Sequence, residues 1–155
     1  MGTTAPPGAL SATGLRVAVV AARYNTELVD QLLAGARAAW LEAGGEPDAL
    51  RVARVPGAFE LPLAAQAFAQ AGSCDAVVAL GCIIRGDTAH FDFVAGECAR
   101  GLQQVMLATG VPVAFGVLTT ENVAQAEARA APGELNKGAE ALQTALAMAR
   151  LLREI

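Results

Sequence analysis

Residues 81–92 read GCIIRGDTAHFD, and they contain the only histidine of the chain, His90. The preceding stretch, DAVVAL at residues 75–80, has the pattern of a buried strand, and apolar residues recur at helical spacing from Phe91 to Met106. We therefore predict that residues 81–92 form a strand-to-helix turn at the carboxyl end of a strand, where open α/β sheets bind ligands. Backbone N–H groups at a helix start favour an anion, and histidine is the side chain that changes its charge near neutral pH.

The rest of the chain reads as one apolar domain. It has 155 residues, of which 54% are hydrophobic and 17% charged, and both values depart from the average in the apolar direction. A chain of this length buries a sizeable core within a single domain. The apolar excess has two explanations, which are small alanines inside helices or a large subunit interface. We favour the interface, because obligate interfaces resemble a domain core cut in half.

Charge and cysteine content argue against several other classes of protein. The net charge is −4 without a basic stripe, so we expect no nucleic-acid partner. The three cysteines, Cys74, Cys82 and Cys98, are odd in number and not spaced as metal ligands, which indicates buried reduced thiols in a cytoplasmic protein and no metal site. The chain has no apolar run of membrane-spanning length and does not begin with a secretory signal pattern.

Apolar periodicity predicts strands that alternate with helices along the whole chain. Strands are expected at residues 15–22, 50–55, 75–80 and 112–118. Helices are expected from a cap at Asn25 or Thr26 to Gly44, from about residue 61 to Gly72, from the histidine turn to Thr109, at residues 122–130, and from residues 136–138 to Arg153.

This alternation predicts an α/β fold with right-handed crossovers. We expect a three-layer αβα sandwich with a four-stranded parallel sheet, of the flavodoxin-like kind. Residues 1–14 are rich in Gly, Pro, Ala, Ser and Thr, and we expect them to form an extended N-terminal arm. Residues 15–155 would then make up the single domain.

Four turns follow the four strands at the same edge of the predicted sheet. Their chemistry-bearing residues are Tyr24 and Asn25 in the first, residues 58–60 in the second, residues 85–90 in the third, and Thr119 and Thr120 in the fourth, with Arg129 and Lys137 beyond. The set comprises an aromatic face, a carboxylate, a histidine, hydroxyls and cations. Such a combination suits a polar planar ring together with a phosphate.

Each of these residues also has a plainer interpretation. Tyr24 could cover the edge of the core, and Glu60 could be an acid favoured by a helix dipole. His90 could be a packed surface histidine, and Arg129 and Lys137 could be solvated charges. The coincidence of four clusters at one sheet edge favours the site.

Six motifs carry a resemblance to a known family. They are ARYN (22–25), VPGAFELP (55–62), GCIIRGDTAHFDFVAGE (81–97), FGVLTTEN (115–122), Arg129 and NKGAEA (136–141). In this order and spacing the chain resembles the 6,7-dimethyl-8-ribityllumazine synthase family from about residue 15 to its C-terminus.

The resemblance implies which residues hold the pyrimidine substrate. Tyr24 would stack on its ring, Asn25 would line the ribityl pocket, and Lys137 would lie near the ring. The remaining contacts are implied for Ala58, Phe59 and Glu60 with the ribityl chain and ring, for the backbone of Cys82, Ile83 and Ile84 with the pyrimidine edge, and for Phe115, which would enter the site of a neighbouring subunit.

The resemblance also implies a phosphate site and a catalytic group. Gly86, Asp87 and Thr88 would form the phosphate-binding turn, Arg129 would grip the phosphate, and His90 would transfer protons. Ala89 stands where the family commonly has proline. Asp87 adds a carboxylate beside the phosphate turn, so we expect that carboxylate to point away from the phosphate.

The implied reaction is a transfer. The enzyme would condense 5-amino-6-(D-ribitylamino)uracil with 3,4-dihydroxy-2-butanone 4-phosphate to give 6,7-dimethyl-8-ribityllumazine, phosphate and water, the penultimate step of riboflavin biosynthesis, without a cofactor. Two other functions remain open. One is a flavodoxin-like module that binds a flavin or a phosphate ligand without chemistry. The other is an inactive shell protein, against which the joint presence of Glu60, His90, Arg129 and Lys137 argues.

Partners follow from the same resemblance. Besides its small-molecule substrates, the chain would meet copies of itself in a ring of five, and rings of five would pack into an icosahedral shell of sixty. The resemblance also implies that the chain associates with riboflavin synthase. Residues 130–135 join Arg129 to Asn136 without an apparent insertion, and we therefore favour the shell over a free pentamer or a decamer.

Overall fold

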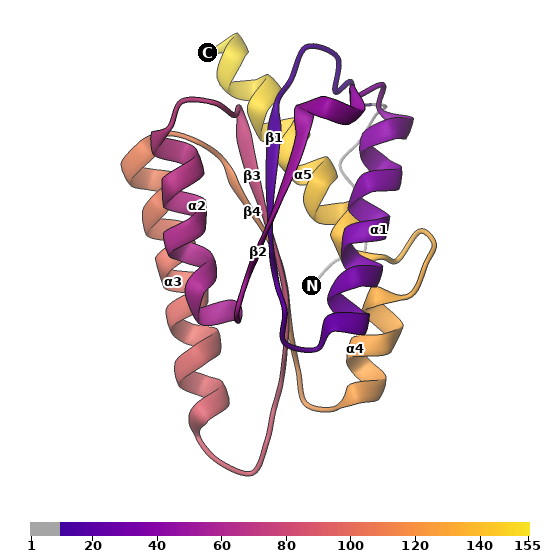
Figure 1. The fold of residues 1–155 in the computed structure, drawn as a ribbon, viewed down its shortest axis with the longest axis vertical. Helices are drawn as coiled ribbons and strands as arrows, with labels where there is room; N and C mark the ends of the chain where they lie inside the picture. The colour runs from indigo at the N-terminus through magenta and orange to yellow at the C-terminus, as the bar shows by residue number, and fades with distance from the viewer. Residues whose placement is uncertain (1–9) are drawn as a thin grey trace.

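Four parallel strands form one sheet in the order β2-β1-β3-β4 (Figure 1). The computed structural model describes residues 10–155. The strands are β1 (Val17–Ala22), β2 (Leu50–Val55), β3 (Ala76–Ile84) and β4 (Val113–Thr120). The helices are α1 (Thr26–Glu42), α2 (Leu61–Gln70), α3 (His90–Thr109), α4 (Val123–Ala130) and α5 (Lys137–Glu154), with single 3-10 turns η1 (Pro47–Ala49) and η2 (Ala58–Glu60).

The helices cover both faces of the sheet, which confirms the predicted three-layer α/β fold. Helices α2 and α3 lie on one face, and α1, α4 and α5 lie on the other (Figure 1). Because neighbouring residues of a strand point to opposite faces, β1 contributes Val17, Val19 and Ala21 to the core under α1 and α5. It contributes Ala18 and Val20 to the core under α2 and α3.

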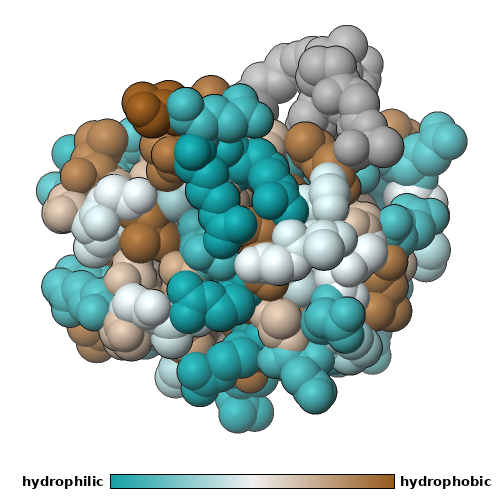
Figure 2. Space-filling model, turned by 90° about the horizontal axis from the view of Figure 1, so that it is seen from above, coloured by the Kyte–Doolittle hydropathy of each residue, from teal (hydrophilic) through white to brown (hydrophobic). Residues whose placement is uncertain are grey.

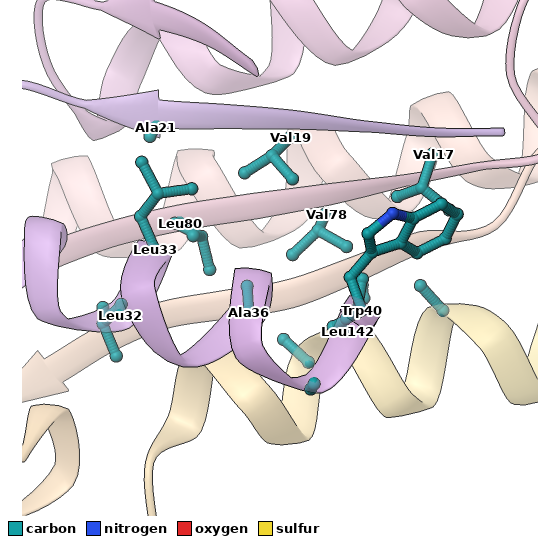
Figure 3. Packing of buried hydrophobic residues seen from close by; sticks show 14 of the residues in the cluster. Val17, Val19, Ala21, Leu32, Leu33, Ala36, Trp40, Val78, Leu80 and Leu142 are labelled. Carbon is teal, nitrogen blue, oxygen red and sulfur yellow. The ribbon is translucent and has the colours of Figure 1, made fainter. Parts of the chain in front are cut away.

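Trp40 is the largest fully buried side chain of the first core. Its indole lies beside Val17 and Leu142, where α1, α5 and the sheet meet (Figure 3). The indole N–H donates to the carbonyl oxygen of Glu46 at 2.8 Å. A Cβ at Gly45 would stand 2.1 Å from the indole ring, so only glycine lets the chain pass this side chain after α1.

Two strands run further than the sequence predicts. Residues 81–84 belong to β3, so the prediction that a turn begins at Gly81 is wrong, and the turn comprises residues 85–89. Thr119 and Thr120 lie at the end of β4 and not in the turn that follows it. Each extension depends on the other. Gly81–Ile84 pair in register with Val117–Thr120, so each segment provides hydrogen-bond partners for the backbone groups of the other.

The amino ends of the strands are tied together by Asp75. Its carboxylate accepts a hydrogen bond from the backbone N–H of Arg16 at 2.7 Å and lies 3.3 Å from the Arg153 guanidinium. Figure 2 shows this end of the molecule, where hydrophilic residues gather in the middle and a mixture of hydrophilic and hydrophobic residues surrounds them. Burial raises the pKa of Asp75, but the N–H of Arg16 and the Arg153 guanidinium outweigh it and lower the pKa overall.

The described part of the N-terminal arm lies against the domain. Ala12 is buried, and its N–H donates to the carbonyl of Ala43 at 2.9 Å. The Arg150 guanidinium of α5 donates to the carbonyl oxygens of Ser11 and Thr13. The rest of the predicted arm, residues 1–9, lies outside the described residues. None of the helices within residues 10–155 combines the length and apolar composition that a membrane crossing requires.

Candidate active site

A pocket of about 530 Å³ opens at the carboxyl ends of β1, β2 and β3, which form the lower edge of the sheet in Figure 1. The strand order reverses between β1 and β3, and such switch points are where α/β sheets bind small molecules. The pocket brings together Tyr24, Asn25, Ala58, Phe59, Glu60, Cys82, Ile83, Ile84 and His90. These nine are all among the site residues that the sequence predicts.

Asn25 joins the first turn of the pocket to β3. Its backbone is left-handed, with φ of 57°, a conformation that asparagine tolerates better than most residues. The side chain does not cap α1 as expected, because its Nδ2 donates instead to the carbonyl oxygen of Cys82 at 2.9 Å. Two of the pocket's walls are therefore linked by one amide. Side-chain caps by asparagine occur at two other helices, where Asn122 caps α4 and Asn136 caps α5.

Tyr24 and Glu60 meet over Gly57. A Cβ at Gly57 would lie 3.2 Å from both the Tyr24 ring and the Glu60 carboxylate, so glycine allows the close approach of the two. One Glu60 oxygen accepts from the Gly57 N–H at 2.9 Å, as the plainer interpretation of a helix-start acid expects. The Tyr24 side chain is 74% exposed. Its ring is thus available to a flat ligand in the pocket.

His90 begins α3 and lines the pocket with Phe93 and Val94 of the same helix. Its backbone N–H lies 3.3 Å from the Thr88 hydroxyl oxygen, which accepts from it. Sequence reasoning did not assign Phe93 and Val94 to the site. Their spacing of three and four residues from His90 was the available signal, because such residues share one helix face. Phe93 is 69% exposed, which adds a second aromatic face to the pocket mouth.

The turn between β3 and α3 is held at its ends by side chains. The Arg85 guanidinium reaches Asp92 of α3 at 3.1 Å and Glu121 beyond β4 at 2.8 Å. The hydrogen bond to Asp92 and the charges of both carboxylates raise the pKa of Arg85. Gly86, Asp87 and Thr88 lie between these anchored ends and are exposed. These three residues lie in sequence between the pocket residues Ile84 and His90 but do not line the pocket themselves.

Three other predicted residues lie away from this pocket. Phe115 lies on β4, at the edge of the sheet, and is half exposed. Arg129 ends α4, where its guanidinium donates to the Gln125 carbonyl at 2.9 Å. Lys137 begins α5, with its ammonium 2.6 Å from Glu140. None of the three lines the pocket of the described chain.

The pocket has an apolar floor and few charges. Cys82 lies at the floor and is buried, and that burial raises the pKa of its thiol to about 11, so it is protonated at neutral pH. Within residues 10–155, Glu60 is the only acidic residue of the lining, and no lysine or arginine belongs to it. An exposed aromatic face, carboxylate oxygens, backbone groups at strand ends and one imidazole are suited to bind a polar planar ring and to move protons.

Comparison with known proteins agrees with the resemblance seen in the sequence. The model of the 6,7-dimethyl-8-ribityllumazine synthase family matches residues 14–153. A 6,7-dimethyl-8-ribityllumazine synthase of Thermus thermophilus is 51% identical over 146 residues, which are 94% of this chain and 93% of the relative. One of Chlorobium limicola is 49% identical over 147 residues, 95% of each chain. A match of this extent covers nearly the whole domain, and the chain belongs to the 6,7-dimethyl-8-ribityllumazine synthase family.

Proposed function

We propose that the chain is an active lumazine synthase and that its chemistry takes place in the pocket between Tyr24, Glu60 and His90. It condenses 5-amino-6-(D-ribitylamino)uracil with 3,4-dihydroxy-2-butanone 4-phosphate in riboflavin biosynthesis. The observation that carries this proposal is that nine predicted site residues from three separate strand ends meet in one pocket. These residues are far apart in the sequence, and only the fold brings them together in one site.

The pyrimidine substrate binds on the Tyr24 side of the pocket. Its ring stacks on the exposed face of Tyr24, and its edge is read by backbone groups of Cys82, Ile83 and Ile84 at the end of β3. The ribityl chain runs along residues 58–60. One Glu60 carboxylate oxygen accepts from the Gly57 N–H, and the other is available to the ribityl hydroxyls. Asn25 braces this arrangement through its hydrogen bond to the Cys82 carbonyl.

His90 moves the protons of the reaction. The amine of the pyrimidine attacks the ketone and forms an imine with loss of water, phosphate leaves, and the ring closes with loss of a second water. Each of these steps transfers a proton near neutral pH, and an imidazole at the pocket wall serves that need. Holding both substrates in reacting geometry supplies much of the remaining acceleration.

The phosphate binds at the turn of residues 86–88, beside the N-terminus of α3, where backbone N–H groups favour an anion. Negative charge near this turn opposes the binding of a phosphate. Asp87, Asp92 and Glu121 are negative, and the nearby Arg85 is engaged with two of these three carboxylates. A phosphate therefore needs a cation from elsewhere, which supports a role for an arginine outside the pocket of its own chain.

We infer that a neighbouring copy supplies that cation. Phe115, Arg129 and Lys137 lie away from the pocket of their own chain, although the family resemblance assigns them to the site. A ring of five copies would explain both their position and their assignment, because each heterologous contact would bring these residues to the pocket of the next copy. The apolar surface supports such an interface, since Phe59, Leu63, Phe93 and Leu107 are all more than half exposed. A shell of sixty such copies remains our proposal for the complete assembly.

The activity is tested by the absorbance of lumazine formed from the two substrates. A flavodoxin-like binding module would hold a ligand without turnover, so absence of product refutes the enzyme. Shared sites are tested by mixing subunits. His90→Ala and Arg129→Ala proteins, each impaired, should recover activity in about one quarter of their sites when co-assembled at random, since a heterologous contact then joins intact halves. No recovery would contradict the shared site.

The size of the assembly is tested separately. Sedimentation or light scattering at neutral pH should give a species near sixty subunits. A species of five subunits and nothing larger would refute the shell, and a monomer would refute the shared site as well.

A further inference from the structure

Asn136 is one of two buried polar residues in the described chain. It caps α5, because its side-chain Oδ1 accepts from the N–H of Ala139 at 3.0 Å. Capping asparagines are common at helix starts and need only an acceptor. The other end of the amide, Nδ2, makes contacts that capping does not require.

The Nδ2 group of Asn136 joins three helices. It donates to the carbonyl oxygen of Ala130 at 2.8 Å and lies 3.3 Å from that of Ala131, both at the end of α4. It also lies 3.1 Å from the carbonyl oxygen of Gln31 in α1. Helix-end carbonyls have no partner within their own helix, so this amide satisfies them and fixes the end of α4 to the start of α5 and to the side of α1.

Two glycines make room for the Asn136 side chain between α1 and α5. A Cβ at Gly35 of α1 would stand 2.1 Å from its Oδ1. A Cβ at Gly138 would stand 1.9 Å from the carbonyl oxygen of Leu32. Two glycines therefore bring the α1 and α5 backbones together around the side chain, and Figure 1 shows the α4–α5 loop beside α1.

The chain between α4 and α5 is otherwise weakly held. Residues 131–135 are exposed, and Gly133 has φ of +121°, which only glycine adopts easily. Along this stretch, the Ala131 N–H donates to the Glu127 carbonyl and the Asn136 N–H donates to the Gly133 carbonyl. The Asn136 side chain is thus the cross-link that sets where α4 ends relative to α5.

The two cations assigned to the site flank this cross-link. Arg129 immediately precedes Ala130, whose carbonyl accepts from the Asn136 amide, and Lys137 immediately follows Asn136. We propose that Asn136 is a positioning residue that holds Arg129 and Lys137 at a set spacing, so that both reach the same substrate-filled pocket. This inference rests on the proposed function, in which Arg129 binds the phosphate and Lys137 lies near the ring.

The test replaces the side-chain amide of Asn136 but keeps a side-chain cap at the start of α5. Asn136→Ser retains an acceptor for the Ala139 N–H but loses the donor to the end of α4. Asn122→Ser is the matched control, because Asn122 caps α4 through the N–H of Gln125 at 2.9 Å and, among the described residues, its side chain makes no hydrogen bond to another helix. We expect Asn136→Ser to raise the KM for the butanone phosphate about tenfold, since small misplacements of a binding group are costly, and Asn122→Ser to leave it unchanged.

A double-mutant cycle separates positioning from general loosening of the fold. If Asn136 acts through Arg129, then Arg129→Ala has a much smaller effect on this KM in the Asn136→Ser background than in the wild type, because contacts that act as one unit are not additive. Fully additive effects would overturn the proposal. If Arg129→Ala changes nothing in the wild type, the assignment of Arg129 to the site has failed, which is a separate result.

A second variant acts on the same amide from the opposite side. Gly35→Ala leaves Asn136 in place and displaces its side chain, while alanine favours the α1 helix more than glycine does. It should raise the KM for the butanone phosphate in the same direction as Asn136→Ser, with circular dichroism confirming a folded protein. If neither variant gives folded protein, the amide serves the fold itself and the positioning role is overturned.

Discussion

Arg85 and Asp92 close the turn that carries the histidine. The two terminal nitrogens of the Arg85 guanidinium lie 3.1 and 3.4 Å from the two carboxylate oxygens of Asp92, and the same group stacks over the Phe91 ring at 4.3 Å. A two-pronged contact of this kind restricts orientation as well as distance. It links the end of β3 to the first turn of α3, and His90 stands between these two points.

Removal of the Arg85–Asp92 contact should slow catalysis without unfolding the protein. In Arg85→Met we expect kcat/KM to fall about three- to tenfold, because the histidine turn loses its outer restraint and misplacement of a catalytic group is costly. The thermal midpoint should stay close to that of the wild type, since exposed ion pairs contribute little to stability. Steady-state kinetics and thermal unfolding check both.

The matched control for Arg85 lies on α3, the helix that carries its partner Asp92. Arg100 pairs with Glu97 at 3.4 Å on the exposed side of α3, away from the pocket. Arg100→Met should leave kcat/KM at the wild-type value. An equal loss in both variants would mean that the loss of a positive charge, and not of the Arg85–Asp92 contact, lowers the rate.

Replacement of His90 should act on the chemical step. His90→Ala is expected to lower kcat by about 10- to 100-fold, at or below the lower end of the usual contribution of an acid–base group. Affinity for the ribitylaminouracil, measured by calorimetry, should change much less, because Tyr24 and residues 58–60 supply the ring and ribityl contacts. An unchanged kcat would remove His90 from the mechanism.

Stacking on Tyr24 should depend on the ring and not on the hydroxyl. Tyr24→Phe should bind the pyrimidine substrate about as well as the wild type, whereas Tyr24→Ala should bind it about tenfold more weakly, the loss expected for one aromatic contact. Titration calorimetry with each variant compares the three affinities. Equal affinities of the wild type and Tyr24→Ala would show that the ring does not stack.

Asp87 should weaken phosphate binding. Its carboxylate is exposed in the turn assigned to the phosphate, and nearby Arg85 is engaged with Asp92 and Glu121. Asp87→Asn removes one negative charge, and we expect the KM for the butanone phosphate to fall about twofold, as for a like charge several ångströms away in water. The effect should shrink at high salt. A higher KM in this variant would mean that the carboxylate helps to bind the substrate.

The ion pairs of Asp75 should make stability depend on pH in the acid range. The pKa of Asp75 is lowered on folding, so its contribution is fully present above the unfolded-state pKa of about 4 and is lost as the pH falls through the folded-state value. Asp75→Asn should therefore destabilise the protein by about 1–2 kcal/mol at pH 7. The difference should vanish at strongly acid pH.

Thermal unfolding of both proteins at one protomer concentration tests this dependence, since assembly makes the midpoint concentration-dependent. A destabilisation of equal size at pH 7 and at strongly acid pH would show that Asp75 acts through packing and not through its charge.

The order of the elements and most of the pocket were predictable from the sequence. Apolar periodicity is a local property, and parallel strands separated by helices must bring their carboxyl ends to one edge. That is why Tyr24, Glu60 and His90 were grouped correctly although they are far apart in the chain. The motifs of the family added roles that periodicity alone does not provide.

Strand ends and side-chain partners were decided by the tertiary structure. Residues 81–84 extend β3 because they find partners on β4, and Asn25 leaves its expected capping role because the Cys82 carbonyl lies within reach. Neither outcome follows from local sequence, since each depends on a group brought near by folding. Asn136 is the clearest case. Its place before a helix is readable as a cap, but its bonds to α1 and α4 exist only once three helices have packed around it.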